Sequence, residues 1–86
     1  MNTPINIKIA ELLFQKHGVL LSNISDVVMW LYEKHGVWIY ARPYDKNKWY
    51  YIIIDVVGNG QKDQSNFNSP TEAYEAAILY TLNNLI

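Results

Sequence analysis

The sequence contains no cysteine, and only 17% of its 86 residues are charged. Without cysteine the chain has no disulfide framework, no thiolate zinc site and no thiol chemistry. It also has no apolar run that approaches the roughly 20 residues a membrane-spanning helix needs. Residues 1–4 lack the charged and apolar regions of a signal peptide. We therefore expect a soluble, cytoplasmic protein that does not bind a membrane.

The charges that are present nearly cancel. Seven Lys and Arg stand against eight Asp and Glu, which gives a formal net charge of -1. This balance excludes both a polybasic arm and an acidic tail. Half of the residues are hydrophobic, which argues against intrinsic disorder. A chain of this length has room for one domain, residues 1–86.

The first half predicts two helices joined by a short extended piece. The first is expected from about Pro4 to Lys16, with Thr3 as N-cap and Pro4 at the first helical position. The second should end at about His35. Each is followed by a glycine, Gly18 or Gly36, which suits a left-handed C′ position. Residues 13–19 and 31–37 align at an offset of 18 residues, and a shared pattern at helix ends is enough to explain this without a duplication.

The second half predicts three strands and a closing helix. Strands are expected at residues 37–42, ended by Pro43, at 48–57 and at 61–67, with a hairpin turn at 58–60. Ser69, Pro70 and Glu72 form a capping box that begins a helix running nearly to Ile86. The fold class is α+β, with helices packed on one face of a small antiparallel three-stranded meander. The order is α, short extended piece, α, β, β, β, α.

Residues 48–57 are almost continuously apolar, which is unusual for a strand with one solvated face. Two explanations stay open. The strand is covered on both faces within the chain, or one of its faces is covered by a partner.

Three segments of the sequence carry a resemblance: residues 30–39, the Trp-Tyr-Tyr triplet at 49–51, and residues 67–77 with 84–86. In these segments the sequence resembles a group of short uncharacterised proteins associated with phages and prophage-like regions of gut anaerobic bacteria. The resemblance extends over about residues 24–86. It implies a fold and a genomic setting, but it assigns no catalytic residue, because the group has no established activity.

The residue types that carry catalysis occur here without the patterns that catalysis needs. His17 and His35 are the only histidines, and their places at two helix ends favour a role at the helix dipole over metal ligation. Ser69 is explained by its cap. Asp55 is the one acid inside the apolar strand. We interpret it as an outward-facing strand residue, with a buried acid of perturbed pKa as the alternative. We therefore expect no enzyme, no metal and no cofactor.

Protein interaction is the leading functional hypothesis. Apolar residues fall on the polar sides of two predicted helices, where they suit an interface. The residues predicted to contact the partner are Met29, Trp30, Leu79 and Tyr80. The expected partner is a second copy, giving a homodimer, or an unidentified protein.

Weak nucleic-acid binding is the alternative. Residues 34–48 hold four basic residues against one acidic residue, and aromatic residues are interleaved with them over the hairpin 34–51. Aromatic faces can stack on bases. The candidate patch is Arg42, Lys46, Lys48, Tyr44 and Trp49. The acidic start of the closing helix, at Glu72, departs from the lysine cluster that double-stranded-RNA-binding domains place there.

Overall fold

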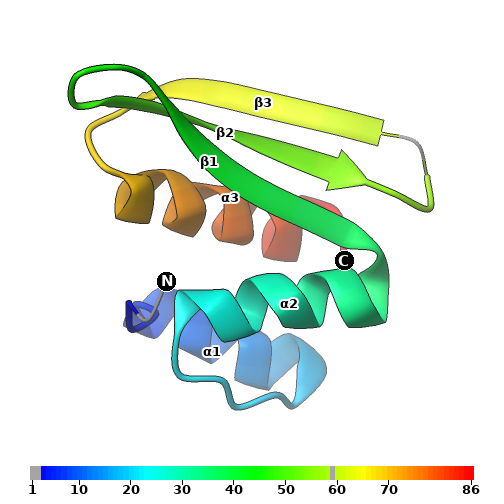
Figure 1. Ribbon diagram of the computed structural model, residues 1–86. Helices are drawn as coiled ribbons and strands as arrows, with labels where there is room; N and C mark the ends of the chain where they lie inside the picture. The colour runs from blue at the N-terminus through cyan, green and yellow to red at the C-terminus, as the bar shows by residue number, and fades with distance from the viewer. Residues whose placement is uncertain (1–2, 59) are drawn as a thin grey trace.

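Three helices and a three-stranded antiparallel sheet make up the computed structural model over its described residues, 3–58 and 60–86. Figure 1 shows the sheet as one layer, with α3 directly beneath it and α1 and α2 farther below. The predicted α+β class and element order are confirmed. The elements in chain order are α1 (Ile7–His17), α2 (Ile24–His35), β1 (Val37–Asp45), β2 (Lys48–Asp55), β3 (Gly60–Phe67) and α3 (Pro70–Asn84).

The predicted start of α1 is wrong by three residues. Asn6, not Thr3, is the N-cap, and its side-chain oxygen accepts a hydrogen bond from the Ile9 N–H at 2.9 Å. Pro4 instead forms an isolated antiparallel bridge with Asn23. The Asn6 amide also donates to Glu75 of α3 at 3.1 Å. Thr3 and Asn6 are both suitable N-cap residues by local propensity. Contacts with residues far away in the sequence, Asn23 and Glu75, select Asn6.

The ends of α1 and α2 are as predicted. Gly18 and Gly36 are the C-caps, with φ values of 64° and 66°. At each end the glycine N–H donates to carbonyls of the last helical turn, as in a left-handed cap. The chain then behaves differently after the two glycines. Gly36 leads directly into β1, whereas residues 19–21 join no strand.

The sheet order is β1-β2-β3, so β2 is central. Pro43 was expected to end the first strand, but β1 continues through it to Asp45. An edge strand accepts proline because every second N–H points away from its only neighbour. Lys46 and Asn47 form the β1–β2 turn, with Asn47 at φ 55°. The predicted turn at 58–60 includes residue 59, which lies outside the described residues.

The capping box of α3 is confirmed with one change in detail. The Ser69 hydroxyl accepts from the Glu72 N–H at 3.1 Å, and Pro70 is the first helical residue. The Glu72 carboxylate accepts from the N–H of Asn68 at 2.9 Å, one residue before the N-cap. Side chains therefore satisfy the backbone N–H groups of both Asn68 and Glu72 at the start of the helix.

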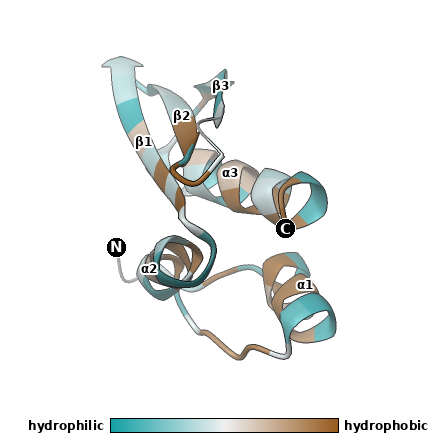
Figure 2. Ribbon diagram, turned by 90° about the vertical axis from the view of Figure 1, so that its right-hand side faces the viewer, coloured by the Kyte–Doolittle hydropathy of each residue, from teal (hydrophilic) through white to brown (hydrophobic). Residues whose placement is uncertain are grey.

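The core lies between the helices and the inner face of the sheet. Figure 2 shows all three helices on one side of the sheet, with hydrophobic stretches directed between them. None of the described helices is long and apolar enough to cross a membrane. The fully buried residues of the domain are Ile9, Leu13, Ile24, Val27, Leu31, Ile39, Tyr51, Ile53, Ala73, Ala77, Ile78, Thr81 and Leu82.

Candidate functional site: the open face of the sheet

The two faces of the sheet have different surroundings. Along β1 and β2 the odd-numbered residues Val37, Ile39, Tyr51 and Ile53 are buried against the helices. Because side chains alternate along a strand, the even-numbered residues lie on the opposite face. Within the described residues no helix lies over that face (Figures 1 and 2), although Tyr32 of α2 contacts it at Trp38. We call it the open face.

The open face is apolar at its centre, although no helix of the described residues lies over it. The register defines its rows: Trp38 pairs with Ile54, and Tyr40 pairs with Ile52. These four side chains are half-buried, and Trp38 also packs against the core and against Tyr32 of α2. β3 contributes polar side chains, since Gln61 pairs with Ile54 and Asp63 with Ile52. Over residues 3–58 and 60–86, the central strand therefore has one face covered by helices and one face over which no helix lies.

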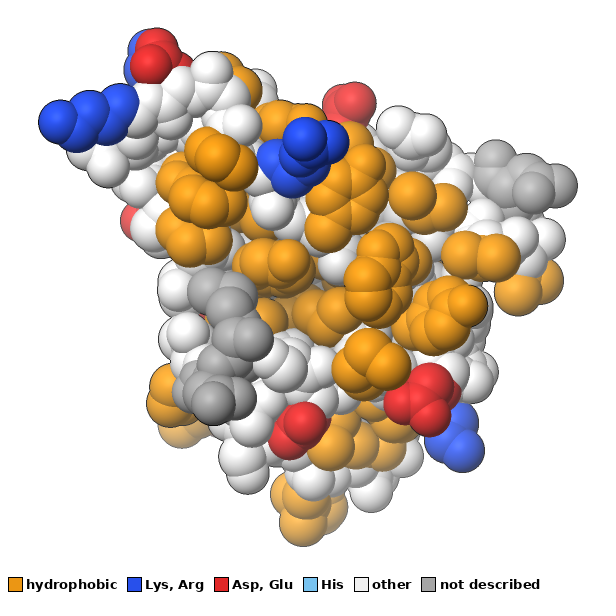
Figure 3. Space-filling view, in the orientation of Figure 1, with side chains coloured by type: hydrophobic (Ala, Val, Ile, Leu, Met, Phe, Trp, Pro, Cys, Tyr) orange, Lys and Arg blue, Asp and Glu red, His pale blue; other side chains and the backbone are white. Residues whose placement is uncertain are grey.

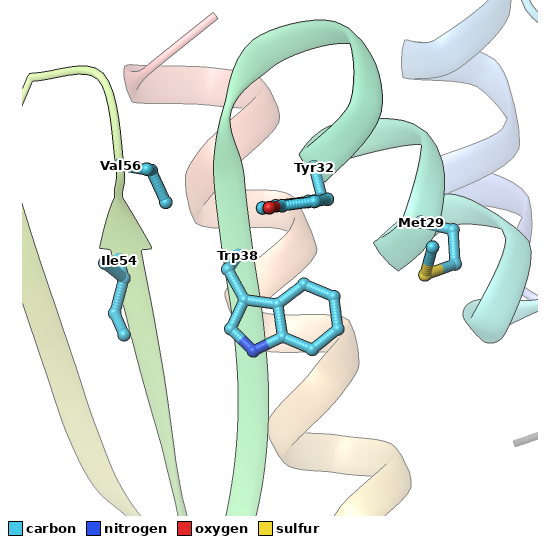
Figure 4. A pocket seen from close by; sticks show the side chains of 5 residues that line it. All are labelled: Met29, Tyr32, Trp38, Ile54 and Val56. Carbon is cyan, nitrogen blue, oxygen red and sulfur yellow. The ribbon is translucent and has the colours of Figure 1, made fainter.

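An apolar groove of about 460 Å³ continues the open face toward α2. Figure 4 shows Ile54 and Val56 of the β2 end on one side and Met29 of α2 on the other, with the Trp38 and Tyr32 rings between them. These two rings meet edge to face, with centroids 5.5 Å apart. In Figure 3 hydrophobic side chains gather across the middle of this side of the molecule, over β1 and toward α2. Met29, Tyr32 and Val56 are 45%, 47% and 51% exposed.

The hairpin end of the open face carries the basic residues. Arg42 pairs with Tyr50, Lys46 lies in the turn and Lys48 begins β2, and all three basic residues are exposed. Tyr44 lies beside Tyr50, with ring centroids 6.1 Å apart, and its hydroxyl donates to Asn66 at 3.1 Å.

Trp49 does not belong with this basic group. It is half-buried and packs against the core beneath the sheet. Its strand neighbour Tyr50 lies beside Arg42 instead, since the two are paired in register. The predicted patch therefore names Trp49, which packs against the core, and omits Tyr50, which lies beside Arg42.

The four residues predicted as a contact surface lie in different places. Met29 lines the groove, whereas Trp30 is half-buried among the rings of His17 and His35. Leu79 and Tyr80 are half-buried on α3, where the Tyr80 ring lies 5.0 Å from the ammonium group of Lys62. Of the four, Met29 is the residue that lines the groove beside the open face.

His17, His35 and Trp30 form a ring cluster where α1 and α2 end. The centroids are 4.9–5.3 Å apart, and all three contacts are edge to face. The Nε2 atom of His17 is buried without a hydrogen-bond partner among the described residues. Burial, and then the nearby charges of His35 and Lys16, lower the pKa of His17. Over the described residues no group of three or more His, Cys, Asp or Glu is placed to hold a metal ion.

Asp55 has a structural role at the end of β2. Its carboxylate accepts a hydrogen bond from the Gly58 N–H at 2.9 Å and so closes the turn. It lies in register with Val37 and Gly60, on the helix side of the sheet. The expectation that Asp55 faces outward is wrong, because its pairing with Val37 places it on the helix side of the sheet. The strand ends at this residue, and the carboxylate turns back to bind the Gly58 N–H.

Sequence reasoning missed most of the open face, including Trp38, Tyr40, Ile52 and Ile54. The signal was present in the alternation of positions 38 and 40, and of 52 and 54. The alternation shows that both faces of the strands are apolar, but it does not show which of the two faces the helices cover.

No protein-family model, curated protein or solved structure matches the chain.

Proposed function

We propose that this chain is a small non-catalytic protein-interaction domain that binds its partner through the open face and the adjoining groove. The observation that carries the proposal is the pair Ile52 and Ile54 on the uncovered side of the central strand, flanked by Trp38 and Tyr40. Contiguous apolar patches on small soluble domains mark interaction sites.

The composition of this surface supports protein binding. Aromatic residues and methionine are enriched at interface centres, and Trp and Tyr dominate their energetics. The open face and the groove together present Trp38, Tyr40, Tyr32 and Met29. Polar residues of β3, such as Gln61 and Asp63, lie along one border of the apolar centre. An apolar centre with a polar border is the usual organisation of a binding surface.

The proposed setting is a phage or prophage-like element, and it rests on the resemblance of residues 24–86 alone. Small proteins of such elements commonly act by binding another protein, which is an argument by analogy. The setting gives no identity for the partner.

Site-specific photo-crosslinking in producing cells tests the proposal. A photoreactive phenylalanine analogue replaces Tyr40 on the open face, and in a control it replaces Lys8, an exposed residue of α1. We expect a discrete covalent adduct from position 40 that is lost when Ile52→Lys is added. Equal adduct patterns from positions 40 and 8 would contradict the proposal.

Binding of single-stranded nucleic acid is a second candidate, favoured by one observation. The Tyr44 and Tyr50 rings lie together beside Arg42 and near Lys48 on the accessible side of the hairpin. Stacking rings next to cations are the elements of single-strand binding. Fluorescence anisotropy with labelled single-stranded DNA and RNA at two salt concentrations tests it. Binding that weakens steeply with salt, and is lost in Arg42→Ala/Lys48→Ala, would establish this candidate; unbound probes would eliminate it.

A further inference from the structure

We infer that the open face binds a second copy of this chain, face to face, around a two-fold axis that lies in the plane between the two sheets. The inference rests on the proposed function and names its partner. Three features of the sheet support it: the charges at its two edges, the form of the edges themselves, and the size of the face.

Two residues of opposite charge lie on opposite edges of the open face, and Lys46 and Lys48 lie apart from them at its hairpin end. Arg42 lies on β1 and Asp63 on β3, with the apolar Ile52 of β2 between the two strands. A two-fold axis in the plane that exchanges β1 with β3 places the Arg42 edge of one copy over the Asp63 edge of the other. Arg42 and Asp63 are one row apart along the strands, about 7 Å, which an extended arginine side chain can span. Symmetry then gives the same pairing twice.

The edges of the sheet oppose the main alternative, in which a second copy adds a strand to the side. β1 contains Pro43 and an irregularity in register between Pro43 and Asp45. β3 has exposed polar side chains along almost its whole length and an irregular register opposite residues 49–51. Proline, irregularities and polar side chains all discourage edge-to-edge pairing. A second copy therefore gains more from the face than from an edge.

The size of the face fits a weak dimer. Three strands of eight or nine residues span about 14 by 26 Å, or about 370 Å² in projection. This is about half of the roughly 800 Å² per partner that stable complexes bury. The groove at Met29, Tyr32 and Val56 adjoins the face and enlarges it. We therefore expect a dimer that dissociates in the micromolar range.

Sedimentation equilibrium over a wide concentration range tests the inference with a matched pair of variants. The wild type should pass from the 10.0 kDa chain to twice that mass as concentration rises. Ile52→Lys should raise the dissociation constant by about tenfold or more. Phe14→Lys, an equally apolar-to-basic change on the far α1 helix at a residue 58% exposed, should leave it unchanged. Loss of the dimer in Phe14→Lys but not in Ile52→Lys would place the contact on α1 and overturn the inference.

A charge exchange tests the symmetry. Arg42→Glu and Asp63→Lys should each weaken the dimer, because each puts like charges opposite one another. The double variant should restore most of the affinity, since the pair is re-formed with its signs reversed. Losses that simply add in the double variant would refute the face-to-face arrangement. Circular dichroism of each variant confirms that the monomer remains folded.

The two proposals can fail separately. If the purified chain stays monomeric at all concentrations while position 40 still crosslinks to a different protein, the second copy is wrong and the interaction function stands. If the chain is monomeric and position 40 gives no specific adduct, both are wrong.

Discussion

Two glycines with nearly identical backbone conformations should differ in their tolerance of alanine. Gly18 and Gly36 end α1 and α2 with φ and ψ within 2° of each other. A Cβ built at Gly18 meets nothing within 4 Å, whereas at Gly36 it would lie 2.6 Å from Cγ2 of Val57. The backbone cost of alanine is the same at both positions, so any difference reports the contact with Val57.

The magnitudes follow from these two terms. Alanine in the left-handed region costs about 1–2 kcal/mol, so we expect Gly18→Ala to lower the free energy of unfolding by about that much. Gly36→Ala must in addition displace Val57. Overpacking costs about 1–3 kcal/mol, and Val57, which is 80% exposed, can move toward solvent. We therefore take the low end and expect Gly36→Ala to cost about 1 kcal/mol more than Gly18→Ala.

Urea unfolding followed by tryptophan fluorescence measures both variants, together with Val57→Ala. Val57→Ala alone should change stability by less than about 0.5 kcal/mol, because its side chain is exposed. In that background the cost of Gly36→Ala should fall to the cost of Gly18→Ala, a coupling of about 1 kcal/mol. Equal costs at the two glycines, or no relief from Val57→Ala, would refute the reasoning.

Three further predictions concern stability. Ser69→Ala should lower the free energy of unfolding by about 1 kcal/mol, because the Glu72 N–H loses its acceptor; a fall below about 0.3 kcal/mol in urea melts would mean that water replaces the cap. Leu82→Ala, at a fully buried position, should lower the free energy of unfolding by about 2–5 kcal/mol. Leu85→Ala, at a position 41% exposed, should lower it by less than about 1 kcal/mol. Similar losses in the two variants would mean that α3 packs differently. Because the folded-state pKa of His17 is lowered, stability should be level above about pH 6.5 and fall as pH drops below that unfolded-state value; a His17→Gln variant that keeps the same pH profile would assign the effect to another group.

Local sequence signals predicted a helix boundary correctly where the residues at that boundary make all of the capping hydrogen bonds themselves. Ser69, Pro70 and Glu72 begin α3 as predicted, because a capping box satisfies its own donors without help from elsewhere. Gly18 and Gly36 end their helices for a similar reason.

Boundaries that depend on distant residues were not predictable in the same way. Pro4 lies in a bridge with Asn23 rather than in a helix, and the Asn6 side chain reaches Glu75 in α3. Pro43 stays within β1 because that strand is at the edge of the sheet, a fact that follows only from the strand order. Local propensity has no information on either point.

The candidate site was only partly within reach for the same reason. Met29 was correctly placed away from the core, but Trp30 is half-buried beside His17. The pattern identifies a residue that lies off the main apolar stripe of a helix. It does not show whether a neighbouring helix end, here that of α1, fills the space beside that residue.

Strand propensity does not explain why the open face carries isoleucine, rather than a polar β-branched residue, at positions 52 and 54. Isoleucine favours strands, so Ile52 and Ile54 would help β2 to form whether or not a partner exists. Threonine is also β-branched and would serve the strand while leaving the face polar. Isoleucine at both positions therefore provides apolar area beyond what the strand requires. No helix of the described residues lies over that area, and this surplus of apolar surface is what the proposed interaction would explain.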